Sequence, residues 1–284
     1  MTKAIHILSS APARARMRQG DDFQYSPRPF EVICTALSAL MWRNTNGPVG
    51  LYTDSYGYEY YRNIGILDVW DAGINTEVLE NMPDINHSIF WAASKLFALR
   101  EERAPVAMID TDLIIWKNLD NFFEKDSISV LHREELIECY VNKENLKIRP
   151  GYIFNPEWNW KEKPCNTAFA YFNNQDFKQD YIAHAMDFMT GNNEPAMENV
   201  SQMVFAEQRL LAMHAASKGI GIIPLVDDPF QKENDIFTHL WGAKDMAREF
   251  PHQAEMLVDS MMNKLRSLSE GTARTLASKF NLTL

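Results

Sequence analysis

The stretch PVAMIDTDLIIWKNL, residues 105–119, places an Asp-Thr-Asp triplet between two apolar runs. The first run predicts a buried strand over 106–109, and Asp110 and Asp112 stand where that strand ends. In open α/β sheets, ligands collect beyond the carboxyl ends of the strands. Paired carboxylates are oxygen ligands of the kind that Mg²⁺ and Mn²⁺ prefer. The triplet therefore predicts a divalent-metal site; the alternative is that one aspartate caps the strand end and the other faces solvent.

The chain before this stretch alternates short apolar runs with helical patterns. Four strands are expected here, over 4–8, 49–53, 66–70 and 106–109. Apolar residues at helical spacing predict a helix from Ser26-Pro27 to Asn46-Gly47 and a buried helix over 87–102. Such alternation is typical of a mostly parallel sheet flanked by helices, so the predicted fold class is α/β.

The pattern is less regular after residue 124. Residues 124–164 are predicted to form short strands and a Trp/Pro/Asn-rich stretch without a helical period, and we interpret them as an insertion that lines the site. The periodicity then predicts a strand over 165–172, a helix closed by Gly191, a helix over 198–218 and a strand over 220–226. We expect one large domain over 1–250 and a C-terminal helical appendage over 251–284. The amphipathic helices of this appendage are expected to pack against the core rather than to bind a membrane or a partner.

Composition restricts the classes of partner. The 284 residues carry a net charge of −10 with a pI of about 5.2, which argues against a surface built for DNA, RNA or an anionic bilayer. The cysteines Cys34, Cys139 and Cys165 show no pairing pattern, as is typical of a reducing compartment. No segment approaches the roughly 20 apolar residues of a membrane span. The expected location is therefore cytoplasmic, and the sequence predicts no oligomeric state.

The stretch 105–119 resembles the Asp-x-Asp segment of GT-A-type glycosyltransferases. Further segments follow in the order seen in the retaining glycogenin-like, galactosyltransferase-like and capsular-polysaccharide-type members: LYTD (51–54), CNTAFAYFNN (165–174), FAEQRLL (205–211) and THLWGAK (238–244). The resemblance covers about residues 49–245. It implies a GT-A (Rossmann-like) fold in which residues 1–250 form the nucleotide-sugar-binding catalytic domain.

The resemblance also implies the ligands of the metal and the diphosphate. Asp110, Asp112 and His239 would hold the ion, and the imidazole favours Mn²⁺ over Mg²⁺. Lys244 would reach the diphosphate of the donor. This chain departs from the family pattern here, because the spacing from His239 to Lys244 is shorter and no Pro-Trp follows the lysine.

Glu207 and Gln208 match the acidic-Gln pair that lies near the reacting sugar in retaining members. Glu207 falls inside an apolar helical stripe, where a carboxylate is costly unless it is paired or used. The alternative for Glu207 is a buried ion pair with a lysine or arginine. Gln208 would touch the donor sugar; its alternative is an amide on the helix surface.

Three further residues would contact the donor by the same resemblance. Lys95 would contact phosphate or sugar, with a snorkelling lysine as the alternative. Asp54 would read the ribose or the base, with a strand-end cap as the alternative. Asn166 would line the sugar pocket, with a plain turn as the alternative.

The predicted function is metal-dependent hexosyl transfer from a nucleoside-diphosphate sugar, with UDP as the expected nucleotide, to an unknown acceptor hydroxyl, with retention. One alternative is a haloacid-dehalogenase-like, Mg²⁺-dependent phosphohydrolase, in which Asp227-Asp228 would join Asp110 and Asp112. Another alternative is an inactive sugar- or nucleotide-binding protein of the same fold.

Overall fold

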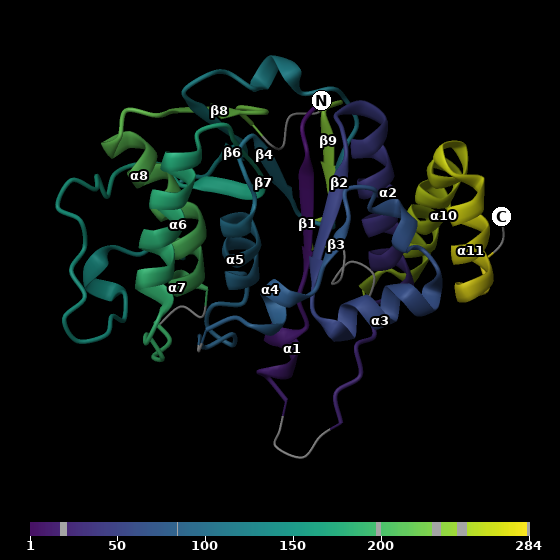
Figure 1. The fold of residues 1–284 in the computed structure, drawn as a ribbon, viewed down its shortest axis with the longest axis horizontal. Coiled ribbons are helices and arrows are strands. Elements are labelled where there is room, and N and C mark those ends of the chain that lie inside the picture. The colour runs from purple at the N-terminus through teal and green to yellow at the C-terminus, as the bar shows by residue number, and fades with distance from the viewer. Residues whose placement is uncertain (18–21, 84, 197–199, 229–233, 243–248, 283–284) are drawn as a thin grey trace.

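A seven-stranded, mostly parallel sheet forms the centre of the computed structural model, which describes residues 1–17, 22–83, 85–196, 200–228, 234–242 and 249–282 (Figure 1). The strand order is β3 (Ile74–Asn75), β2 (Val49–Thr53), β1 (Ala4–Leu8), β4 (Val106–Ile109), β7 (Cys165–Phe172), β6 (Ser127–Arg133) and β8 (Gly221–Pro224). Strand β7 runs antiparallel to both of its neighbours, and all other neighbours are parallel.

The central strands are buried on both faces, which explains their continuous apolar sequences. In β1, Ala4 faces one core cluster and Ile5 faces the other. In β4, Ala107 and Ile109 join the first cluster, whereas Val106 and Met108 join the second. This alternation is the two-residue period of a strand, here covered by helices on both sides.

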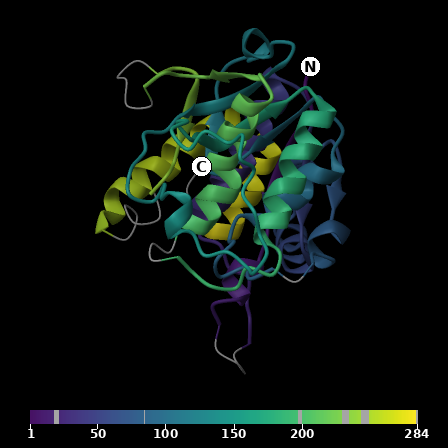
Figure 2. The same cartoon turned by 90° about the vertical axis from the view of Figure 1, so that its left-hand side faces the viewer.

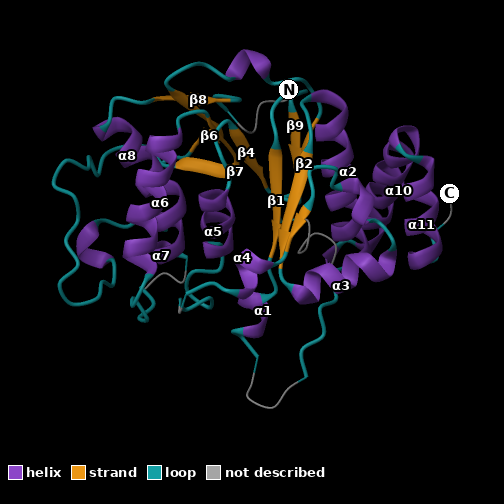
Figure 3. Cartoon of the chain, viewed as in Figure 1, coloured by secondary structure: helices purple, strands orange, loops and turns teal. Residues whose placement is uncertain are grey.

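Helices form a layer on each face of the sheet (Figure 3). One layer contains α2 (Pro29–Thr45), α3 (Ser55–Ile64), α10 (Pro251–Leu268) and α11 (Glu270–Phe280). The other contains α4 (Glu77–Glu80), α5 (Ala93–Glu101), α6 (Gln175–Met189), α7 (Ser201–Val204) and α8 (Leu210–Ser217). Figure 2 shows α6 and α8 in front, with the C-terminal helices (yellow) behind them. The predicted α/β class, a mostly parallel sheet flanked by helices with C-terminal helices, is confirmed.

A second, two-stranded sheet pairs β5 (Leu113–Ile115) with β9 (Phe237–His239) in antiparallel register. Leu113 lies opposite His239, and the backbone N–H of Leu240 donates to the carbonyl of Asp112 at 2.9 Å. A short helix, α1 (Ala11–Arg14), follows β1. The small sheet therefore brings the segment around residue 239 to the end of β4.

Several predicted boundaries are wrong, each for a local reason. Helix α2 begins at Pro29 rather than at Ser26-Pro27, and at its start the Glu31 carboxylate accepts a hydrogen bond from the backbone N–H of Arg28 at 2.9 Å. The strand predicted over 66–70 is instead a 3-10 turn, Leu67–Val69, and the edge strand is β3. The segment before it forms α3, which Asp54 caps and Gly65 ends in a left-handed conformation (φ 88°).

The two long helices of the second layer are also shorter or less regular than predicted. Helix α5 begins at Ala93, not near residue 87, because turns precede it. The helix predicted over 198–218 is divided into α7, a π turn over Phe205–Arg209 and α8. The strand predicted over 220–226 is confined to Gly221–Pro224. Apolar periodicity does not distinguish a π turn from a continuous helix.

The C-terminal helices pack against α2, as expected for an appendage that covers the core. They bury Met261, Met262, Leu265, Ala273, Leu276 and Ala277 in the same cluster as the strands. None of the helices in the described ranges is long and apolar enough to cross a membrane. The boundary at residue 250 stays a prediction.

Packing of α10 can be tested with a matched pair of substitutions. Leu265 is completely buried, so Leu265→Ala should lower the free energy of unfolding by about 2–5 kcal/mol, measured by urea denaturation. Met256 lies on the same helix and is 62% exposed, so Met256→Ala should change it by less than about 0.5 kcal/mol. Equal effects of the two substitutions would contradict the packing of α10 described above.

Candidate active site

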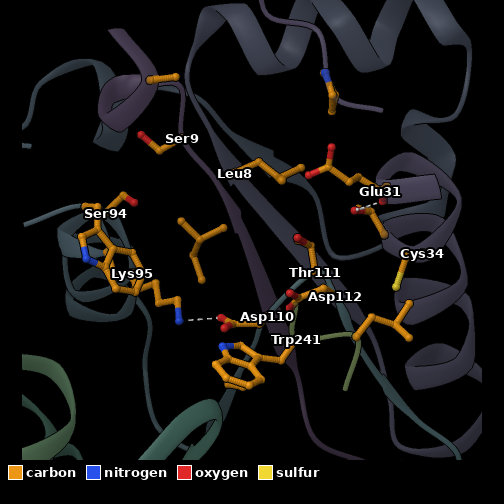
Figure 4. A pocket seen from close by; sticks show the side chains of 18 of the residues that line it. Leu8, Ser9, Glu31, Cys34, Ser94, Lys95, Asp110, Thr111, Asp112 and Trp241 are labelled. Atoms are coloured by element: carbon orange, nitrogen blue, oxygen red, sulfur yellow. Dashed lines mark hydrogen bonds and ion pairs between the residues drawn. The ribbon is translucent and has the colours of Figure 1, made fainter. Parts of the chain in front are cut away.

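A cavity of about 1090 Å³ opens at the carboxyl ends of β1 and β4. Its wall combines the Asp-Thr-Asp triplet with the loop after β1, the first turns of α2, the start of α5, the start of β7, the π turn and residues 239–242. Figure 4 shows side chains from several of these elements pointing into one space. Its size suits a ligand of the dimensions of a nucleotide sugar.

Asp110, Asp112 and His239 come together at this cavity. One ligand atom from each lies within 4.8 Å of the others, and Asp112 Oδ1 is 3.6 Å from His239 Nε2. Two backbone contacts hold them there: the N–H of Asp110 donates to the carbonyl of Ala168 at 2.7 Å, and β9 pairs with β5 directly after the triplet. The three residues predicted as metal ligands therefore form one donor set.

The electrostatics of the two aspartates differ. Burial raises the pKa of Asp110 to about 6, although the nearby ammonium of Lys95 opposes this shift. Burial acts on Asp112 in the same sense, but the hydrogen bond and charge of His239 outweigh it and bring the pKa of Asp112 below its ordinary value. The two carboxylates are thus held close together, and the charge of Asp110 is not fully compensated, a setting that favours a cation.

Lys95 connects the triplet to the π turn. Its Nζ lies 2.6 Å from Asp110 Oδ1 and 2.9 Å from Glu207 Oε1, and the first of these ion pairs is drawn in Figure 4. Burial alone would lower the pKa of Lys95, but its two carboxylate partners raise the pKa by a larger amount, so the net shift is upward. The alternative considered for Glu207, a buried ion pair with a lysine, is present, and it lies inside the cavity wall rather than away from it.

Glu207 belongs to a turn with unusual geometry. The π turn Phe205–Arg209 lies between α7 and α8, and its Glu207 side chain is 1% exposed. Glu207 Oε2 has no hydrogen-bond partner among the residues that the structure describes. Single π turns inside α-helices occur frequently at functional sites. The turn therefore places in the cavity wall a buried carboxylate with one oxygen that has no partner among the described residues.

Neighbouring side chains stabilise this turn. The Tyr181 hydroxyl of α6 donates to the carbonyl of Glu207 at 2.7 Å. The Arg209 guanidinium, which is buried, donates to the carbonyls of Tyr140 and Val141 at 2.6 and 2.5 Å and also to that of Trp160. These hydrogen bonds hold the backbone of the π turn in its irregular conformation. A regular helix would not need them.

Gln208 and Asn166 also line the cavity. Gln208 Oε1 accepts a hydrogen bond from the Tyr140 hydroxyl at 2.6 Å, which leaves the amide N–H groups for another partner. Asn166 Nδ2 donates to Glu134 Oε1 at 2.8 Å, and its Oδ1 accepts from the N–H of Ala168 at 3.1 Å. Two hydrogen bonds therefore hold the Asn166 side chain in place, which is more than the alternative of a plain turn would require.

The remaining predicted residues are placed differently. Asp54 does not line the cavity: its Oδ1 accepts from the N–H of Gly57 at 3.1 Å and its Oδ2 from that of Ser10 at 2.6 Å. Asp54 therefore caps the start of α3. This role is similar to the strand-end cap that was the alternative to a ligand role. Lys244 lies outside the described residues. Asp227 and Asp228 are exposed after β8 and are not part of the cavity wall, so the arrangement required for the phosphohydrolase alternative does not form.

Some lining residues were not anticipated from the sequence. Residues 23–27 form part of the wall, as do Trp91 and Trp241, and the Trp241 side chain is 83% exposed. The sequence feature that could have indicated these lining residues is the presence of aromatic residues in segments without helical or strand periodicity. Exposed aromatic rings at a cavity can stack on a base or a sugar ring.

Solved structures that resemble this chain include three transferases. Apo mouse xyloside xylosyltransferase 1 has a TM-score of 0.35 at 10% identity, over 79% of this chain and 84% of its own. The apo glycosyltransferase GlyE of Streptococcus pneumoniae TIGR4 has a TM-score of 0.44 at 14% identity, over 99% and 63%. The inositol-1-phosphate CTP transferase of T. maritima has a TM-score of 0.42 at 14% identity, over 94% and 96%. At these TM-scores and identities, none of the three carries an activity over to this chain.

Among curated proteins, no sequence similar to this one was found. A family model matches residues 6–266, a range that contains Lys95, the Asp-Thr-Asp triplet, Glu207 and His239. The chain therefore belongs to that family, a family of unknown function (DUF6734).

Proposed function

We propose that this protein is a metal-dependent glycosyltransferase that uses a nucleoside-diphosphate sugar, with UDP as the nucleotide, and an acceptor hydroxyl. The observation that carries the proposal is the convergence of Asp110, Asp112 and His239 in a cavity of about 1090 Å³ that also contains Lys95 and Glu207. Each group has a distinct use in the transfer of a sugar from a diphosphate.

The donor set fits a divalent cation. Two carboxylates and an imidazole suit Mn²⁺ or Mg²⁺, and the charge of Asp110 is not fully compensated by the protein. When bound, the ion would supply Lewis-acid neutralisation of the charge that develops on the leaving diphosphate. Asp110, Asp112 and His239 are the residues that would hold it.

Lys95 supplies a second positive charge beside the same position. Its ammonium already contacts Asp110, and its side chain is only 16% exposed, so it acts where water screens charge weakly. A fixed cation of this kind stabilises a departing diphosphate without reorganisation during the reaction. Lys244, by resemblance, would add to this charge.

Glu207 and Gln208 are proposed to face the reacting sugar. Glu207 has one oxygen held by Lys95 and one without a protein partner, and the Gln208 amide N–H groups are available to sugar hydroxyls. A carboxylate held there would stabilise positive charge that develops at the anomeric carbon. Retention is supported by the match of this pair to retaining glycosyltransferases. The proposed cytoplasmic location is supported by the three free cysteines.

Metal-dependent nucleotide binding is the first test. In thermal unfolding, UDP with Mn²⁺ should raise the Tm of the wild-type protein by about 5–10 °C when the ligand is present at about 100 times its Kd. UDP without the ion should raise it much less. Asp112→Asn should abolish the Mn²⁺-dependent part of the shift, whereas Asp259→Asn, an exposed carboxylate of α10, should leave it intact. A shift with UDP that is independent of Mn²⁺ and of Asp112 would contradict the proposed site.

The charge role of Lys95 has a separate signature. Lys95→Met leaves Asp110 and Glu207 without their shared counter-charge, so the free energy of unfolding in EDTA should fall by about 3–5 kcal/mol. Mn²⁺ should restore stability more in this variant than in the wild type, because the ion no longer competes with the ammonium. An equal effect of Mn²⁺ on both proteins would show that Lys95 does not share a site with the ion.

Transfer itself is tested by donor turnover and product configuration. Release of UDP from a panel of UDP-sugars should depend on Mn²⁺, and Glu207→Gln should lower kcat by at least about 100-fold with little change in the Kd of UDP. NMR of the product should show retained anomeric configuration. An inverted product would refute retention, and UDP binding without turnover of any donor would favour the inactive alternative.

A further inference from the structure

A second group of metal-ligating side chains lies in the helical layer that contains α6 and α8. Asp180 and His184 are one turn apart on α6, and His214 faces them from α8. His214 Nε2 is 3.2 Å from Asp180 Oδ2, and His184 Nε2 is 3.7 Å from Asp180 Oδ1. One ligand atom from each of the three lies within 4.8 Å of the others. None of these residues lines the cavity of the candidate active site.

His214 is the observation that points to a ligand. Its side chain is completely buried, and although Nε2 lies 3.2 Å from Asp180 Oδ2, Nδ1 makes no hydrogen bond to any of the described residues. The His214 ring stacks on Phe177 at 5.4 Å between centroids and meets the His184 ring at 5.1 Å. Buried polar atoms are nearly always satisfied, so a buried imidazole with an unpartnered nitrogen, set beside a carboxylate and a second imidazole, calls for a further partner.

The chemistry of the set selects the class of ion. Two imidazoles and one carboxylate are a common ligand set of Zn²⁺. Tetrahedral coordination with bonds of about 2.0–2.1 Å places ligand atoms about 3.3 Å apart. His214 Nε2 lies 3.2 Å from Asp180 Oδ2 and His184 Nε2 lies 3.7 Å from Asp180 Oδ1, so each imidazole is at about this distance from one oxygen of the carboxylate.

We propose that Asp180, His184 and His214 bind a transition-metal ion, with Zn²⁺ as the ion that fits best. Lys218 Nζ, at 3.1 Å from Asp180 Oδ2, supplies the carboxylate with a positive charge in the absence of the ion. The Lys218 side chain is 47% exposed and can turn into solvent when the ion binds. A fourth coordination position is then open to water.

Such an ion would cross-link α6 to α8. Helix α8 continues directly from the π turn that carries Glu207, and Tyr181, next to Asp180, donates to the Glu207 carbonyl at 2.7 Å. The ion would therefore stabilise the helical layer behind the active site without touching the substrate. This role does not depend on the reaction proposed above.

Zinc binding should be measured by calorimetry in an Asp112→Asn/His239→Ala background, so that the first donor set cannot contribute. One Zn²⁺ per chain is expected to bind, and the Tm should rise. His184→Ala in this background should weaken binding more than about 10-fold, since loss of even an outer-shell partner costs about 10–100-fold. His252→Ala is the matched control: His252 is exposed on α10 with Glu255 at 3.6 Å, and its loss should change nothing.

Two further measurements distinguish the site from adventitious binding. Lys218→Met removes the competing ammonium and should tighten Zn²⁺ binding, whereas loss of an unrelated surface lysine, Lys264→Met, should not. Co²⁺ should give the intense visible absorption of a four-coordinate ion in the background protein but not in its His184→Ala variant, which far-UV circular dichroism should show to be folded. Absence of stoichiometric Zn²⁺ binding in the background, or binding that survives His184→Ala, would overturn the proposal.

Discussion

Compensation of negative charge, buried at Glu207 and partly buried at Asp110, is the constraint on which the site depends. Asp110, Asp112 and Glu207 converge from two distant parts of the chain, and Lys95 is the ammonium that contacts two of them. Removing charges from water is costly unless each charge is paired, so neither the end of β4 nor the π turn could take its present position alone. Lys95 and His239 therefore stabilise the structure around the site and are also candidates for the proposed chemistry.

The reversed direction of β7 gives this site its second wall. The parallel strands β1 and β4 end at the cavity, whereas the antiparallel β7 begins there. Asn166 and Thr167 thus reach the cavity from the start of a strand, and the carbonyl of Ala168 accepts from the N–H of Asp110. One antiparallel strand places sugar-pocket candidates and metal-ligand candidates at the same edge of the sheet.

Sequence reasoning was accurate where a single local pattern determines the structure. Strands β1, β2, β4 and β7 are mostly apolar, and their bounds agree with the prediction. It failed where the structure depends on a cap or on distant pairing. Asp54 was read as a ligand although it caps α3, and the two-residue strand β3 exists only because it pairs with β2. The partner of Glu207 lies 112 positions away, and no local signal distinguishes Lys95 from other lysines.

The charges of the site also determine an order of binding. Three carboxylates and one ammonium carry a net charge of about −2 when all four are ionised and His239 is neutral, and a divalent cation brings that sum close to zero. A diphosphate entering before the ion would meet net negative charge and be repelled. If Asp110 held an ion, the Lys95 ammonium would lose part of its attraction to that carboxylate and could take the diphosphate as a partner, while its contact with Glu207 would keep it in place. In the proposed transferase, the ion would therefore bind before the donor or together with it, and the lysine that pairs with Asp110 and Glu207 would also stabilise the leaving group.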